Sequence, residues 1–158
     1  MSGAPIWCVS IWGAPVPAAR PRFDSVRRRT YTPSQYDRWK KAAARLCRNQ
    51  WGAPEPVSVG VAVLVEVTLP RPKCKPAKGT LHRQYWHPTE DYPLPLRGDA
   101  DNYAKAALDA LVQGGVLKDD DLVVELSVTK CAGTRPGIDI TLSLVEPEEA
   151  DVSGVAAK

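Results

Sequence analysis

The sequence is poor in residue types that define several classes of protein. Its 158 residues include only four cysteines, two histidines and one phenylalanine. No CxxC pair occurs and no histidine stands at zinc spacing from a cysteine, which argues against a zinc site. Four cysteines are also few for a disulfide scaffold of this length, so we expect reduced thiols. No apolar run approaches the roughly 20 residues needed to span a bilayer.

The N-terminus, MSGAPIWCVSIWG, has neither a basic leader nor a long apolar core, so we expect no signal peptide. These absences predict a soluble, cytoplasmic protein with no membrane partner. The aliphatic content is normal and no short period recurs, which excludes collagen-like and wholly disordered chains. We expect one domain over residues 1–146 and a flexible acidic tail over 147–158.

Charge is distributed unevenly along the chain. Residues 1–98 carry 16 Lys and Arg against 6 Asp and Glu, a net charge of +10. Residues 99–158 carry 5 against 12, a net charge of −7. This polarity favours a half that binds a polyanion beside a half rich in carboxylates. Composition alone is equally compatible with two charge sets that only solvate opposite surfaces.

Strand-like and helix-like segments alternate in the order β-α-β-α-β-β. Turn signals and hydrophobic periodicity predict strands over 6–12, 57–69, 122–130 and 138–145, and helices over 33–49 and 100–113. Thr32 is the expected N-cap of the first helix, and the last two strands are expected to pair as a hairpin through 132–137. Residues 14–32 and 70–98 are expected to be long loops. The fold class is therefore α+β, a small mixed sheet with two helices packed against it.

The start of the second helix is rich in carboxylates. Asp99 occupies the expected N-cap position and Asp101 lies in the first turn. Asp101, Lys105 and Asp109 are spaced by four residues, so they line one ridge of the helix. We expect Asp109 to pair with a basic neighbour. Capping and the helix macrodipole favour aspartate here without any metal, so the DxD spacing alone is weak evidence.

A second acidic cluster, Asp119-Asp120-Asp121, comes immediately before the third predicted strand. A polar turn would explain this run without further chemistry. A sheet covered by the second helix can, however, bring the two acidic clusters together. Hard oxygen ligands at this density suit Mg²⁺ or Mn²⁺, and a divalent cation would offset the repulsion among them.

Four segments together resemble one family. These are PVPAARPRF near the N-terminus, TYTPSQYDRWKKAAA, GDADNYAKAALDAL and KDDDLVVELSVTK. In this order, over roughly residues 10–145, they are similar to the RusA family of Holliday-junction resolvases. The most specific part is the series DxDN-x2-K, LDAL, DD and VVEL. The resemblance implies a homodimeric, Mg²⁺-dependent endonuclease that cuts branched DNA in recombination and repair, often encoded on phages or prophages.

The resemblance also assigns roles to individual residues. Asp99 and Asp101 match the two aspartates of the DxDN motif, Lys105 the catalytic lysine, and Asp120 the second aspartate of DD. The three aspartates would hold one or two Mg²⁺ ions at the scissile phosphate. Lys105 would offset charge on the phosphate or orient the attacking water. Since three aspartates are consecutive, Asp121 remains an alternative to Asp120.

The basic half is the expected DNA-binding surface. A Pro-rich loop with interleaved aromatic residues can contact phosphates and insert a ring at an unstacked junction, although each arginine alone is compatible with a solvated charge run. The candidate residues are Arg20, Arg22, Arg27, Arg28 and Arg29, with Lys73 and Lys75 in a possible second arm.

Three other functions compete with a junction resolvase. A less selective flap or single-strand endonuclease would use the same site. A branched-DNA-binding module would keep the acidic cluster as a structural feature only. Aspartyl phosphotransferases also combine DxD, a lysine and DD, but they place DxD after a buried strand. Pro93 and Pro95 make the segment before Asp99 a poor strand, which disfavours that class.

Overall fold

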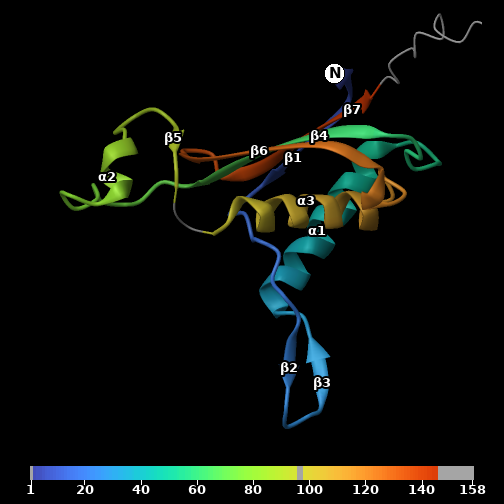
Figure 1. Ribbon diagram of the computed structural model, residues 1–158, viewed down its shortest axis with the longest axis horizontal. Coiled ribbons are helices and arrows are strands. Elements are labelled where there is room, and N and C mark those ends of the chain that lie inside the picture. Colours follow the sequence, from blue (N-terminus) through green and yellow to red (C-terminus); the bar gives the residue numbers. More distant parts are fainter. Residues whose placement is uncertain (1, 96–97, 146–158) are drawn as a thin grey trace, which may run out of the picture.

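One mixed sheet, with helices packed on one face, organises the computed structural model, which describes residues 2–95 and 98–145 (Figure 1). The predicted tail, 147–158, lies outside the described residues. The spatial order of the five strands is β1 (Ser2–Trp12), β7 (Gly137–Val145), β4 (Val61–Pro70), β6 (Val123–Gly133) and β5 (Tyr92–Pro93). Strand β4 runs parallel to β6 and antiparallel to β7. The predicted α+β class is thus confirmed.

The central strand β4 supplies much of the core. Its alternate residues Val61, Val63, Val65 and Val67 are at most 2% exposed, because they face the helices. Glu66, between two of them, is exposed on the other face. Stiff β-branched side chains with a period of two are the pattern of a strand with one buried face. This face fixes the plane on which the helices lie.

Helices α1 (Ser34–Trp51) and α3 (Ala100–Gly114) cover that face and pack against each other. They approach closely at Gly114, where a Cβ atom would lie 2.9 Å from both the Ala44 carbonyl oxygen and the Cys47 Cβ. The Arg48 guanidinium also donates a hydrogen bond of 2.9 Å to the Gln113 carbonyl oxygen. The end of α3 is therefore held directly against α1.

The helix boundaries differ slightly from the sequence expectation. The first helix begins at Ser34, not Pro33, and Pro33 occupies the cap position without a side-chain hydrogen bond. Thr32 is therefore not the N-cap, because the fixed φ of Pro33, −51°, is combined with an extended ψ of 131°. Asp99 does occupy the cap position of α3, yet its side chain makes no capping hydrogen bond.

The hairpin expected between the last two strands does not form. Strands β6 and β7 both pair with β4, which lies between them, and the turn over 134–136 passes across the end of β4. Gly133 pairs with Pro70 at this crossing, and a Cβ on Gly133 would lie 2.6 Å from the Thr68 Cγ2 atom. Periodicity identifies a strand but not its partner. Here β4 lies between β6 and β7, which are consecutive in the sequence.

The two long loops contain regular structure. Residues 14–32 include an antiparallel hairpin of β2 (Arg22–Asp24) and β3 (Arg29–Tyr31), which projects away from the sheet (Figure 1). Residues 70–95 include the short helix α2 (Leu81–Tyr85) as well as β5. Arg71 fastens this segment, since its guanidinium donates to the His87 carbonyl oxygen at 2.8 Å and lies 3.4 Å from Asp91.

Hydropathy adds one negative finding. Within residues 2–95 and 98–145, no helix combines the length and the apolar character that crossing a membrane requires.

We expect Gly114→Ala to lower the free energy of unfolding by about 1–3 kcal/mol, because overpacking against α1 outweighs the gain in helix propensity. Urea unfolding at equilibrium measures the change. Gln113→Ala is the matched control, since that side chain is exposed on the same turn, and it should change stability by less than about 0.5 kcal/mol. Equal stability of Gly114→Ala and the wild type would show that overpacking against α1 costs no more than the helix propensity that alanine gains.

Candidate active site

The exposed ridge of α3 carries a series of charged side chains. Asp101 is exposed in the first turn, and Lys105 and Asp109 follow at intervals of four residues. Asp99 is exposed at the cap position, two residues before Asp101. Among the described residues, neither Asp99 nor Asp101 lies within salt-bridge distance of a basic side chain. Both carboxylates are therefore open to another cation.

The second acidic cluster forms a tight turn before β6. A single 3₁₀ turn, η1 (Asp120–Leu122), is capped by Asp119, whose carboxylate accepts the backbone N–H of Asp121 at 3.1 Å. This hydrogen bond, with a second one from Asp120, holds the pKa of Asp119 below its usual value. Carboxylate oxygens of the three aspartates lie within 4.8 Å of one another and all three residues are exposed. One of the three thus has a structural role in the turn.

A groove of about 470 Å³ brings the two acidic clusters to one place. Asp101 and Lys105 from α3 and Asp120 from η1 line it together. Its remaining lining is apolar, from Ala104, Leu108, Leu126 and Val128. Three of the four predicted catalytic residues therefore share one groove. Asp99 is not in its lining, and neither are Asp119 and Asp121.

The donor set in the groove fits a hard divalent cation. Asp101 and Asp120 come from different elements and offer carboxylate oxygens to the same space. Carboxylates and water are the ligands that Mg²⁺ and Mn²⁺ prefer. Asp99, at the cap position two residues before Asp101, is the remaining predicted ligand and does not line the groove.

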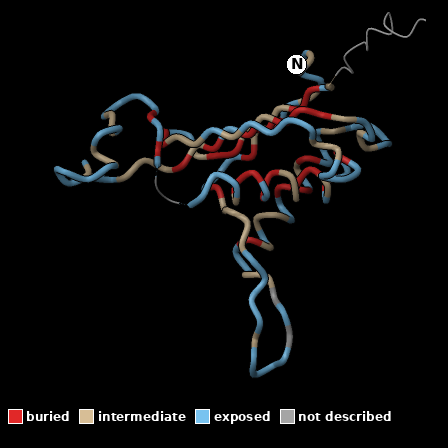
Figure 2. Tube along the Cα trace, in the orientation of Figure 1, coloured by how far each residue is buried: buried red, intermediate tan, exposed pale blue. Residues whose placement is uncertain are grey.

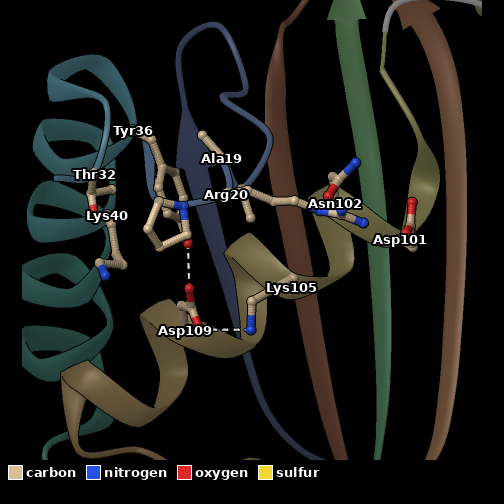
Figure 3. A pocket seen from close by; sticks show the side chains of 11 residues that line it. Ala19, Arg20, Thr32, Tyr36, Lys40, Asp101, Asn102, Lys105 and Asp109 are labelled. Carbon is tan, nitrogen blue, oxygen red and sulfur yellow. Dashed lines mark hydrogen bonds and ion pairs between the residues drawn. The ribbon is translucent and has the colours of Figure 1, made fainter. Parts of the chain in front are cut away.

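Lys105 is held by a chain of contacts that reaches α1. Its Nζ lies 3.8 Å from the Asp109 carboxylate, which confirms the expected pairing of Asp109 with a basic neighbour. The other Asp109 oxygen accepts a hydrogen bond from the Tyr36 hydroxyl, and Figure 3 shows the two side chains pointing toward each other from α1 and α3. Burial of Tyr36, followed by its hydrogen bond to Asp109, raises its pKa well above the ordinary value, so the hydroxyl remains a donor.

Sequence reasoning missed the role of Tyr36. Its place in the helical pattern predicts only that it is buried, and the structure leaves it 4% exposed. A buried tyrosine hydroxyl generally finds a hydrogen-bond partner, so the residue type was the available signal. The partner, however, is 73 positions away in the sequence.

A second cleft, of about 350 Å³, adjoins the groove. Asp101 and Lys105 line both spaces, and the cleft is completed by the base of the β2–β3 hairpin and by α1. Arg20 extends across it toward Asn102, as Figure 3 shows. The backbone N–H of Ala18 donates to the Asn102 carbonyl oxygen at 2.9 Å, which fastens this loop to the first turn of α3.

The β2–β3 hairpin presents the other predicted arginines to solvent. Arg22, Arg27 and Arg28 are exposed, and Figure 2 shows the hairpin as an exposed projection. The side chain of Arg29 is outside what the structure describes. At the turn, the Asp24 carboxylate accepts the backbone N–H groups of Val26 at 3.0 Å and Arg27 at 3.1 Å. The hairpin is therefore an ordered, basic projection.

Lys73 and Lys75 occupy a different place. They precede α2, in the segment at one end of the sheet, apart from the hairpin and from the groove (Figure 1). Both are exposed, and the Lys75 Nζ lies 5.0 Å from the centre of the Trp86 ring. The structure thus does not bring the two predicted basic arms together.

Comparison with known proteins identifies the class of this fold and site. The chain matches the family model described as Endodeoxyribonuclease RusA over residues 13–143, which is most of its length. This is a class of hydrolases that cut within DNA strands. The chain belongs to the RusA endodeoxyribonuclease family, whose members resolve Holliday junctions. No curated protein matches the chain.

We expect Asp24→Ala to speed hydrogen exchange of the Val26 and Arg27 amides several-fold, because both lose their common acceptor. Exchange followed residue by residue by NMR measures this. Ser25→Ala, in the same turn, should leave both amides at their wild-type rates. Unchanged exchange in Asp24→Ala would show that the carboxylate does not hold the turn.

Proposed function

We propose that this protein is a homodimeric, Mg²⁺-dependent endonuclease that hydrolyses phosphodiester bonds in branched DNA, above all in four-way junctions. The observation that supports this most directly is the single groove lined by Asp101, Lys105 and Asp120. Membership of the RusA family supports the DNA cleavage, and the open carboxylates support the metal. One nuclease domain, residues 1–146, would carry the activity.

Each residue of the groove has a distinct task in this proposal. Asp101 and Asp120, together with Asp99 from the cap position of α3, would hold Mg²⁺, or Mn²⁺ in its place. When bound, the cation polarises the scissile phosphate and acidifies a coordinated water. Lys105 donates to a phosphate oxygen and offsets the charge that develops there.

The basic surface would bind and orient the DNA. The β2–β3 hairpin projects on the side of the sheet that α1 and α3 cover (Figure 1), and residues at its base line the cleft, so its arginines would contact phosphates beyond the cut. Lys73 and Lys75 would contact a separate stretch of backbone. Two subunits are proposed because the symmetric cutting of a junction requires two active sites.

We expect Asp101→Asn to slow Mg²⁺-dependent cleavage of a synthetic four-way junction at least about 100-fold, because a ligand charge is lost at the site. Junction binding should remain, since the basic residues are unchanged. Glu125→Gln is the matched control: this exposed carboxylate on β6 lines a separate hollow on the uncovered face of the sheet. If Asp101→Asn cut as fast as Glu125→Gln, the acidic cluster would be structural only.

Substrate choice is tested with the same enzyme on junctions, flaps and plain duplexes. Preferential, paired nicking of the four-way junction supports a resolvase. Equal cutting of all three substrates would contradict junction selectivity.

The triple aspartate allows a finer test. We expect Asp120→Asn to slow cleavage as much as Asp101→Asn does, and Asp121→Asn to retain most activity, because Asp120 lines the groove and Asp121 does not. Rates measured over a Mg²⁺ titration separate weakened metal binding from a damaged turn. Loss of activity in Asp121→Asn, with Asp120→Asn still active, would assign the third metal ligand to Asp121 and not to Asp120.

A further inference from the structure

Lys40 on α1 and Lys105 on α3 both interact with the buried Tyr36, Lys40 directly and Lys105 through Asp109. The Lys40 Nζ lies 5.4 Å from the centre of the Tyr36 ring, within the range of a cation–π contact. The Tyr36 hydroxyl donates to Asp109, and Asp109 pairs with Lys105. A continuous chain, Lys40–Tyr36–Asp109–Lys105, therefore runs from α1 to α3 across the cleft (Figure 3).

The cleft carries an excess of positive charge. Arg20, Lys40 and Lys105 line it against Asp101 and Asp109. The charges of Asp109 and Lys105 largely offset each other as an ion pair, so Arg20 and Lys40 remain against the single carboxylate of Asp101. Among the ion pairs of the described residues, none engages Arg20 or Lys40. Both cations are thus available to a ligand.

The cleft is also continuous with the groove, because Asp101 and Lys105 line both. We propose, resting on the proposed nuclease function, that this cleft binds the backbone phosphate next to the one that is cut. Lys40 and Arg20 contact that phosphate, while Tyr36 and Asp109 are positioning residues that fix Lys40 and Lys105. Neither positioning residue touches the DNA.

The phosphate contact is tested with Lys40→Gln. Binding to a synthetic four-way junction is measured over a salt series, with Ca²⁺ in place of Mg²⁺. We expect Lys40→Gln to reduce the slope of log K against log salt concentration by about 1, the signature of one lost phosphate contact. Lys41→Gln is the matched control, because the Lys41 Nζ pairs with Asp37 at 2.8 Å and does not line the cleft. A wild-type slope in Lys40→Gln, or an equal fall in Lys41→Gln, would overturn the contact.

The positioning role is tested with a double-mutant cycle on single-turnover cleavage. We expect Asp109→Asn to slow cleavage about 10- to 100-fold, the usual cost of losing a group that orients a functional residue. Junction affinity should change by less than about 2-fold. In a Lys105→Ala background, Asp109→Asn should cause no further loss, because Asp109 acts through Lys105. Asp109→Glu should recover part of the rate, since it keeps the carboxylate.

Tyr36→Phe removes only the hydroxyl and leaves the ring beneath Lys40. We expect a smaller loss of rate than in Asp109→Asn, with the salt slope unchanged. Thermal unfolding of each variant establishes that the fold is retained. If Asp109→Asn slows the Lys105→Ala enzyme as much as it slows the wild type, Asp109 does not act through Lys105.

The outcomes separate this inference from the proposed function. Loss of cleavage in Asp101→Asn together with an additive Asp109–Lys105 cycle would overturn the positioning role and leave the nuclease intact. Cleavage that survives Asp101→Asn would instead overturn the proposed function, and with it the reason for a second phosphate site.

Discussion

Helix α3 buries a face of small side chains between the sheet and α1, and this close packing determines where its charged ridge lies. Ala106, Ala107 and Ala110 have no exposed surface, and Gly114 lets the α1 backbone approach directly. Small side chains allow the helix to sit low on the sheet. Asp120, in the acidic turn before β6, then lines the same groove as Asp101. The position of the groove thus depends on which face of α3 carries the small side chains.

The carboxylates at the site divide into those that have a partner and those that have none among the described residues. Asp109 is paired on both oxygens, and Asp119 is occupied in its own turn. Asp101 and Asp120, which meet in the groove, have no basic partner among the described residues. Exposed ion pairs such as Lys105–Asp109 contribute only about 0–1 kcal/mol to stability, so their main effect is on where the side chains point. The charge pattern therefore distinguishes groups that hold the structure from groups left open for a ligand.

Sequence patterns predict local features of this fold well and long-range ones poorly. The period of α3 places Asp101, Lys105 and Asp109 on one ridge, and the structure agrees because helical geometry is set locally. The pairing of β6 and β7 with β4 depends on contacts between distant segments, so the expected hairpin is wrong. The β2–β3 hairpin is not predicted, because its segment is rich in proline and arginine and lacks the apolar alternation of a strand. The link from Tyr36 to Asp109 needs two helices to be docked first, which no spacing rule contains.

The pairing of β1 with β7 has a consequence for how the chain acquires this structure. Trp12 lies opposite Gly137, so β1 finds its partner β7 only after β4, α3 and β6 have been synthesised. Such non-local pairings cost loop-closure entropy before they gain contacts, and they slow folding. During synthesis, β1 stays without its neighbour while α1, β4 and α3 are made. The helices and the groove formed by α3, η1 and β6 can therefore assemble before β7 is made, whereas β1 joins the sheet only after β7.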